Sequence, residues 1–173
     1  MLQRIQTIYI ILFCAVLFTA SFLPFASIVL EDQSTYNFYP TGWESKSSLE
    51  GFKVYPFYSG YLVAVAFGIL MLVNFKKRQK QLRYGMLSYF FVLITLVYMF
   101  LEVSSAEEFL LGNENNSLQS INYTFSMYLL VGSLPIIFLA NRAIKKDEKL
   151  VSSLDRLRSV SYTHLTLPTS SVV

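Results

Sequence analysis

The sequence predicts an all-α membrane protein: a bundle of four transmembrane helices with a small extracytoplasmic β-hairpin or strand cap. Apolar residues make up 54% of the 173 residues and charged residues only 14%, whereas soluble domains carry roughly 25% charged residues. The charges are also clustered, so that four long uncharged stretches separate them. Uncharged stretches of about 18 residues or more are long enough to cross the hydrocarbon of a bilayer as helices.

The boundaries of the predicted elements follow from these stretches. We expect the four spans at about residues 7–25, 57–75, 84–101 and 123–140. Each span should be a helix, because in hydrocarbon every backbone N–H and C=O must be paired within its own segment. In the charged segment 142–158, leucines recur at helical spacing, which predicts a cytoplasmic amphipathic helix. Residues 1–158 thus form the predicted four-span membrane domain.

Lysine and arginine predict how the spans are oriented. The link between the second and third spans is strongly basic, whereas the two loops on the other side of the bundle are mostly acidic. The residues that we expect to determine the topology are Arg4, Lys76, Lys77, Arg78, Lys80, Arg83, Arg142, Lys145, Lys146 and Lys149. Because cytoplasmic loops carry the excess of basic residues, both termini should be cytoplasmic. The predicted location is the cytoplasmic (inner) membrane, crossed several times.

The first outer loop, residues 31–56, combines aromatic residues with turn residues. Tyr36 and Phe38 alternate with Asn37, and a second alternation surrounds Lys53, as in short half-buried strands. We expect these strands to cap the outer end of the bundle. Its aromatic residues form either a recognition surface for a partner or a belt that anchors the loop at the membrane interface. The second outer loop, 102–120, is acidic, and we expect it to be solvated.

Gly60, Ala64 and Gly68 are spaced four residues apart in the second span, so they share one helix face. Small residues at this spacing let two helix backbones approach closely. We therefore predict that these three residues form a helix-packing contact.

The sequence offers no chemistry of its own. The four predicted span cores contain no ionisable residue, and the chain has a single cysteine, Cys14, and a single histidine, His164. We expect no enzyme activity, cofactor, metal or nucleic acid. The expected function is non-enzymatic protein interaction in envelope assembly or upkeep, in contact with the lipid bilayer and with a membrane-protein partner or a second copy of the chain. The alternative is a subunit of a transporter or channel whose pathway forms at an oligomer interface.

Two terminal motifs carry a family resemblance. The opening MLQRIQTIYIIL and the segment NRAIKKDEKLVSSLDRLR, residues 141–158, resemble an uncharacterised family of four-span Bacteroidota inner-membrane proteins, a domain of unknown function. The resemblance covers residues 1–158 and implies a membrane location, a longer first outer loop and a basic middle link. It brings no catalytic residues to this chain.

Residues 159–173 do not fit this pattern. The segment Val160–Thr169 can be written in codons as GTC TCT TAT ACA CAT CTG ACG CTG CCG ACG, which resembles the inner sequence of a common transposon-based sequencing adapter. We therefore predict that residues 159–173 are an artefactual tail and that His164 is not a functional site.

Overall fold

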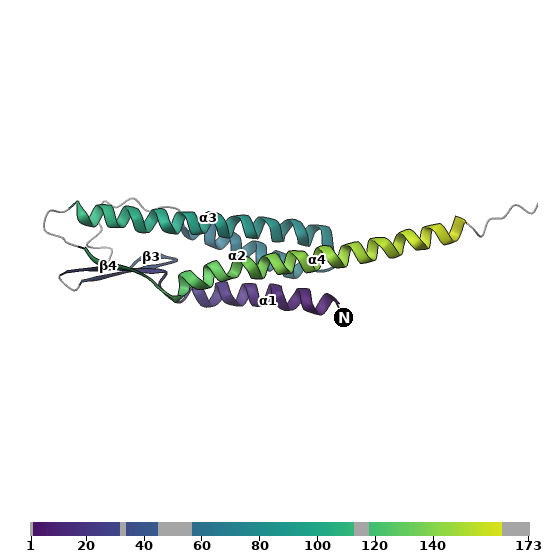
Figure 1. Ribbon diagram of the computed structural model, residues 1–173, viewed down its shortest axis with the longest axis horizontal. Helices are drawn as coiled ribbons and strands as arrows, with labels where there is room; N and C mark the ends of the chain where they lie inside the picture. The colour runs from purple at the N-terminus through teal and green to yellow at the C-terminus, as the bar shows by residue number, and fades with distance from the viewer. Residues whose placement is uncertain (1, 32–33, 45–56, 113–117, 164–173) are drawn as a thin grey trace, which may run out of the picture.

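The computed structural model describes residues 2–31, 34–44, 57–112 and 118–163. There, four helices form an elongated bundle, and a small sheet closes one end of it, which we call the sheet end (Figure 1). The helices are α1 (Leu2–Ala20), α2 (Phe57–Val73), α3 (Arg78–Leu111) and α4 (Phe125–Thr163). The strands are β1 (Ala26–Leu30), β2 (Thr35–Tyr39), β3 (Gly42–Trp43) and β4 (Leu118–Tyr123).

The four helices form a ring in which consecutive helices are neighbours. The most extensive contacts join α2 to α3 and α1 to α4, and α3 also packs on α4. The contact between α1 and α2 is the smallest of the four. Large side chains that point into the ring, among them Phe13, Met99 and Ile137, are completely buried. The bundle therefore has a packed core and one comparatively loose seam, between α1 and α2.

The sheet is antiparallel, with the strand order β3-β2-β1-β4. Ala26 of β1 lies opposite both Phe38 and Tyr123, and Ser27 lies opposite both Asn37 and Asn122. Because side chains alternate between the two faces of a sheet, these registers give the sheet an apolar face and a polar face. Ala26 and Phe38 are buried, so the apolar face packs on the end of the bundle.

The first predicted span, 7–25, is too long. The helix ends at Ala20, and the apolar chain then turns and enters β1. The residue before a proline disfavours the helical conformation, so Pro24 prevents the helix from continuing. The β-branched residues Ile28 and Val29 are equally suited to a half-buried strand. The apolar run to Leu30 thus contains a helix and a strand.

The predictions for the third and fourth spans also need correction. Instead of ending near residue 101, α3 continues to Leu111 through the segment that we expected to be a solvated loop. It does so because Glu102, Ala106 and Leu110 recur at helical spacing and are buried. The fourth span begins at Phe125, since the residues before it form β4. The predicted amphipathic helix 142–158 is part of the same uninterrupted helix α4.

The strand cap is confirmed as a small sheet, but it is larger than predicted. Only β2 and β3 come from the described part of the loop 31–56, whereas β1 precedes that loop and β4 comes from the second one. The predicted strand around Lys53 lies outside the described residues, as does His164.

Two helices, Arg78–Leu111 and Phe125–Ser153, are long and apolar enough to cross a membrane. Only 33% and 28% of their most apolar stretches are buried inside the molecule, whereas the core helix of a soluble protein is mostly buried. The apolar stretches of the other two helices, Ile5–Ala20 and Phe57–Val73, are shorter. The part of the chain that the structure describes thus supplies two candidate spans by length and composition, where the sequence predicted four.

Candidate functional site at the basic end of the bundle

The residues predicted to determine topology gather at the end of the bundle opposite the sheet, which we call the basic end (Figure 1). Arg4 belongs to the start of α1, and Lys76 and Lys77 form part of the link between α2 and α3. Arg78, Lys80 and Arg83 lie in the first turns of α3. Arg142, Lys145, Lys146 and Lys149 lie in the part of α4 that passes this end. Glu44 directly follows β3, and Glu107 and Glu108 belong to the last turns of α3. Charge of opposite sign is therefore separated along the bundle.

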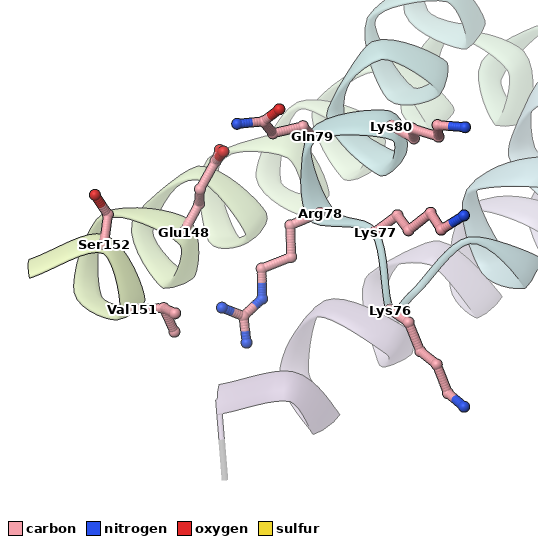
Figure 2. Close-up of a pocket in the computed structure, with 8 residues that line it drawn as sticks. All are labelled: Lys76, Lys77, Arg78, Gln79, Lys80, Glu148, Val151 and Ser152. Atoms are coloured by element: carbon pink, nitrogen blue, oxygen red, sulfur yellow. The ribbon is translucent and has the colours of Figure 1, made fainter. Parts of the chain in front are cut away.

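A groove with a volume of about 580 Å³ lies at the basic end, between the start of α3 and α4. Its lining residues are Lys76, Lys77, Arg78, Gln79, Lys80, Glu148, Val151 and Ser152. Figure 2 shows Arg78 extending into the space beside α4, while the side chains of Lys76, Lys77 and Lys80 point away from it. The groove is thus less cationic than the basic residues that line it would suggest.

An ion pair further reduces the charge of this groove. Arg78 Nε lies 3.1 Å from Asp147 Oδ2, and Asp147 is buried. A carboxylate removed from water is stabilised only if it is paired, so Arg78 compensates Asp147 and joins α3 to α4.

A second group of polar side chains lies inside the basic end. Gln6, Gln81 and Asp147 are buried, and Gln6 Nε2 donates to the Ala143 carbonyl over 3.5 Å. In the described part of the chain, Gln81 Oε1 and Asn141 Oδ1 are buried without a hydrogen-bond partner. Buried polar atoms are normally paired, so leaving these two oxygens unpaired is costly for the stability of this end of the bundle.

The sheet end holds a buried charged residue that the sequence analysis placed in a solvated loop. Glu102 is fully buried, and its Oε1 accepts a hydrogen bond from Trp43 Nε1 over 3.2 Å. The ring of Phe38 packs against both Trp43 and Phe57, with centroids 5.1 Å apart in each case. These rings lie in the core, so Phe38 and Trp43 belong to neither a lipid-facing belt nor an exposed recognition surface.

The small residues predicted for helix packing meet two different helices. A Cβ on Gly60 would lie 3.0 Å from Thr95 Oγ1 of α3, and the Ala64 carbonyl accepts a hydrogen bond from Ser88 Oγ over 2.9 Å. A Cβ on Gly68 would instead lie 3.0 Å from Phe13 Cε1 of α1. All three positions are buried, and they place α2 close to both of its neighbours.

A polar pattern along α3 was not among the features predicted from the sequence. Gln81, Ser88, Thr95 and Glu102 are spaced seven residues apart, and all four are buried. A seven-residue spacing keeps side chains on one face of a helix, so this pattern was present in the sequence. The basic residues at Lys76–Arg83 and the apolar residues between these positions made the helix resemble a lipid-facing span with a charged end.

Comparison with known proteins identifies the family. The family model described as "Domain of unknown function (DUF4293)" matches residues 2–157. The chain belongs to this family. The predicted membership in a family of unknown function is therefore confirmed, while the relation to Bacteroidota proteins stays a prediction. No curated protein and no solved structure matches the chain. Among the described residues, no three His, Cys, Asp or Glu side chains gather in a way that would hold a metal ion.

Proposed function

We propose that the protein crosses the cytoplasmic membrane four times, with both termini in the cytoplasm, and acts by non-enzymatic protein interaction in envelope assembly or upkeep. The observation that carries this proposal is the apolar surface of the bundle between its two polar ends. Large apolar side chains are exposed on all four helices, for example Ile8 and Phe18 on α1, Leu62 and Ile69 on α2, Phe90 and Val97 on α3, and Phe138 and Leu139 on α4.

This exposed surface supports a bilayer as the surroundings of the bundle. Phe18 and Phe138 are 66% and 58% exposed, and each Å² of apolar surface left in water costs roughly 25 cal/mol. Soluble monomers rarely expose contiguous apolar patches of more than a few hundred Å². Lipid around all four helices would remove this cost.

The two short helices are compatible with spanning segments. At 1.5 Å per residue, the 19 residues of α1 and the 17 residues of α2 extend about 28 Å and about 26 Å. The hydrocarbon core is about 30 Å thick, and spans of about 17–25 residues occur. An exposed aromatic residue lies just beyond the end of each helix: Phe22 follows α1, and Phe75 follows α2. Modest local thinning of the bilayer would account for the remaining difference.

The charge distribution supports the orientation. Lysines and arginines surround the basic end, where α1 begins and α4 leaves the bundle (Figure 1). Basic residues near span ends are retained in the cytoplasm. The sheet would then lie outside, with its polar face toward solvent. That face, which includes Ser27, Asn37 and Asn122, is the surface that we propose for contact with an envelope protein.

Cysteine labelling tests the orientation. In a Cys14→Ser background, Thr41→Cys introduces an exposed thiol at the sheet end and Gln79→Cys introduces one at the basic end. A membrane-impermeant maleimide added to intact spheroplasts should label Thr41→Cys and not Gln79→Cys, and both variants should react after lysis. The reverse labelling order, or recovery of the protein in the soluble fraction, would refute the proposal.

A further inference from the structure

The two edges of the small sheet differ in length and protection. The strand order β3-β2-β1-β4 makes β3 and β4 the edge strands. β3 has only two residues, whereas β4 has six and contains neither a charged residue nor a proline. Proteins usually protect an exposed edge with a very short strand, with charges or with proline. The β3 edge has such protection, and the β4 edge does not.

The hydrogen bonds of the sheet show which backbone groups of β4 face away from it. Thr124 N donates to the Phe25 carbonyl over 3.1 Å, in the same register as the β1–β4 pair. In an antiparallel pair, alternate residues direct their N–H and C=O groups toward the partner strand. Counting back from Thr124, Asn122 pairs with β1, whereas the N–H and C=O groups of Ile121 and Tyr123 point outward.

These outward groups have no strand beside them in the described part of the chain. There, β1 is the one element with which β4 makes an extensive contact. Asn122 is exposed, and Tyr123 is 37% exposed although its ring contacts that of Phe100 on α3, with centroids 5.7 Å apart. Unpaired backbone groups are not tolerated in hydrocarbon, so this edge lies in water or beneath a partner.

The surroundings of this edge are acidic. No lysine or arginine occurs in the described residues of the sheet end, which are 21–31, 34–44, 102–112 and 118–124. Burial raises the pKa of the Tyr123 hydroxyl, and the nearby Glu107 carboxylate raises it further. A basic partner is therefore complementary in charge to this end of the sheet.

We propose that the β4 edge binds an extended, basic segment of an envelope protein, which adds to the four-stranded sheet as a further strand. Its backbone pairs with the outward groups of Ile121 and Tyr123, and a lysine or arginine side chain lies near Glu107. Strand addition to an exposed edge is a recurrent mode of peptide recognition. The inference rests on the proposed function and names the contact through which that function is carried out.

A second copy of the chain fits this edge less well. Antiparallel pairing of two β4 strands requires a twofold axis perpendicular to the sheet, and the strands run roughly along the bundle (Figure 1). Such an axis would invert the second bundle, against the single orientation proposed for the membrane. Parallel pairing keeps the orientation but places the Glu107 carboxylates of both copies at the same level, where like charges repel.

Fluorescence anisotropy with the full chain in mild detergent tests the edge. The probe is a short fluorescent peptide of alternating valine and threonine with a lysine at each end. We expect it to bind about tenfold more tightly than its fully N-methylated form, which has the same side chains but no N–H groups. A peptide with glutamate in place of lysine should bind several-fold more weakly.

Ile121→Pro tests the same contact from the protein side. It removes one outward N–H group and leaves the bonds to β1 intact, because proline is tolerated in an edge strand where its nitrogen faces away from the ladder. Binding of the lysine peptide should weaken about tenfold. The matched control is Ile121→Ala, which shortens the same side chain but keeps the N–H group and should bind as the parent does. If Ile121→Pro does not fold, the N-methylated peptide still tests the backbone contact on the parent protein.

No binding of the lysine peptide, or equal binding of the N-methylated or glutamate peptide, would overturn the inference. Equal binding by the two Ile121 variants would also overturn it. A dimer of the parent chain that Ile121→Pro dissociates would do the same, since β4 would then pair with a second copy. If Thr41→Cys and Gln79→Cys nevertheless label as expected, the proposed location and orientation stand and only strand addition fails.

Discussion

At Gly85, α3 packs closely against α4. A Cβ at this position would overlap Asn141 Oδ1 and would lie 2.9 Å from Met71 Cε, so the contact also involves α2. The glycine is required here because the side chains of Asn141 and Met71 occupy the space beside it, not because of its backbone conformation. Gly132 on α4 provides the contrast, since nothing lies within 4 Å of a Cβ built there.

We predict that Gly85→Ala destabilises the protein by about 1–3 kcal/mol, the usual cost of adding a methyl group to a packed core. Asn141 and Met71 would have to move to accommodate it. Gly132→Ala should be neutral or stabilising by up to about 1 kcal/mol, because alanine favours the helix. Thermal unfolding in detergent compares the two variants. Equal midpoints would show that the close approach at Gly85 contributes little.

Among the elements, α2 and α3 show how small and polar residues organise the bundle. Ser88 and Thr95 on α3 lie at the level of Ala64 and Gly60 on α2, and the hydroxyl groups of both donate to backbone carbonyls. Such pairing satisfies polar groups inside the bundle and contributes modestly to helix association. The unpaired buried oxygens in the described residues occur only near the basic end. The hydroxyl groups in the middle of the polar face of α3 are thus paired, whereas Gln81 Oε1 at its basic end is not.

The prediction for α2 concerns its contact with α1. Gly68→Leu should lower the unfolding temperature strongly, because the new side chain would collide with Phe13 and Cys14 and force the two backbones apart. Leu70→Ile, at a position that is 39% exposed, conserves volume and should cost less than about 1.5 kcal/mol. Comparable unfolding temperatures for both variants would exclude a close α1–α2 contact.

For the whole molecule, the relevant feature is the order of surfaces along the long axis of the bundle, whose two ends can be followed in Figure 1. A polar sheet face lies at one end, exposed apolar side chains cover the sides, and basic residues surround the other end. The described core contains polar groups that pair locally, such as Ser126 Oγ with the Ala20 carbonyl over 2.7 Å. The transport alternative therefore needs its polar groups at an oligomer interface, because a pathway needs polar groups that face a continuous channel.

Purification in mild detergent distinguishes these two functions. We expect stable envelope-protein partners to accompany the intact chain, and we expect Asn37→Lys on the polar sheet face to reduce their recovery several-fold, because a new charge there disfavours the partner's surface. Ser153→Lys, an exposed position at the basic end, is the control and should not change recovery. Substrate flux through liposomes that contain the purified chain, without such partners, would instead support the transporter alternative.

Local patterns in the sequence predicted part of this fold. The existence of four apolar helices, the alternation around Phe38 and the concentration of basic residues between α2 and α3 all depend on composition and spacing within one segment. Helical hydrogen bonds close within a few residues, so such patterns suffice. The seven-residue spacing of polar residues on α3 is a local pattern as well, so it can be read from the sequence. The burial of these residues cannot be read in this way.

The tertiary structure alone decided the features that depend on partners distant in the chain. Strand hydrogen bonds join separate segments, so the pairing of β1 with β4 and the end of α1 at Ala20 were decided by residues far away in the sequence. Glu102 is buried because Trp43 and the sheet cover it. A cavity lined by Gln81 lies between α1 and α2, because these helices separate near the basic end. It therefore depends on the arrangement of three helices. Burial depends on what packs around a residue, and only the folded chain supplies those neighbours.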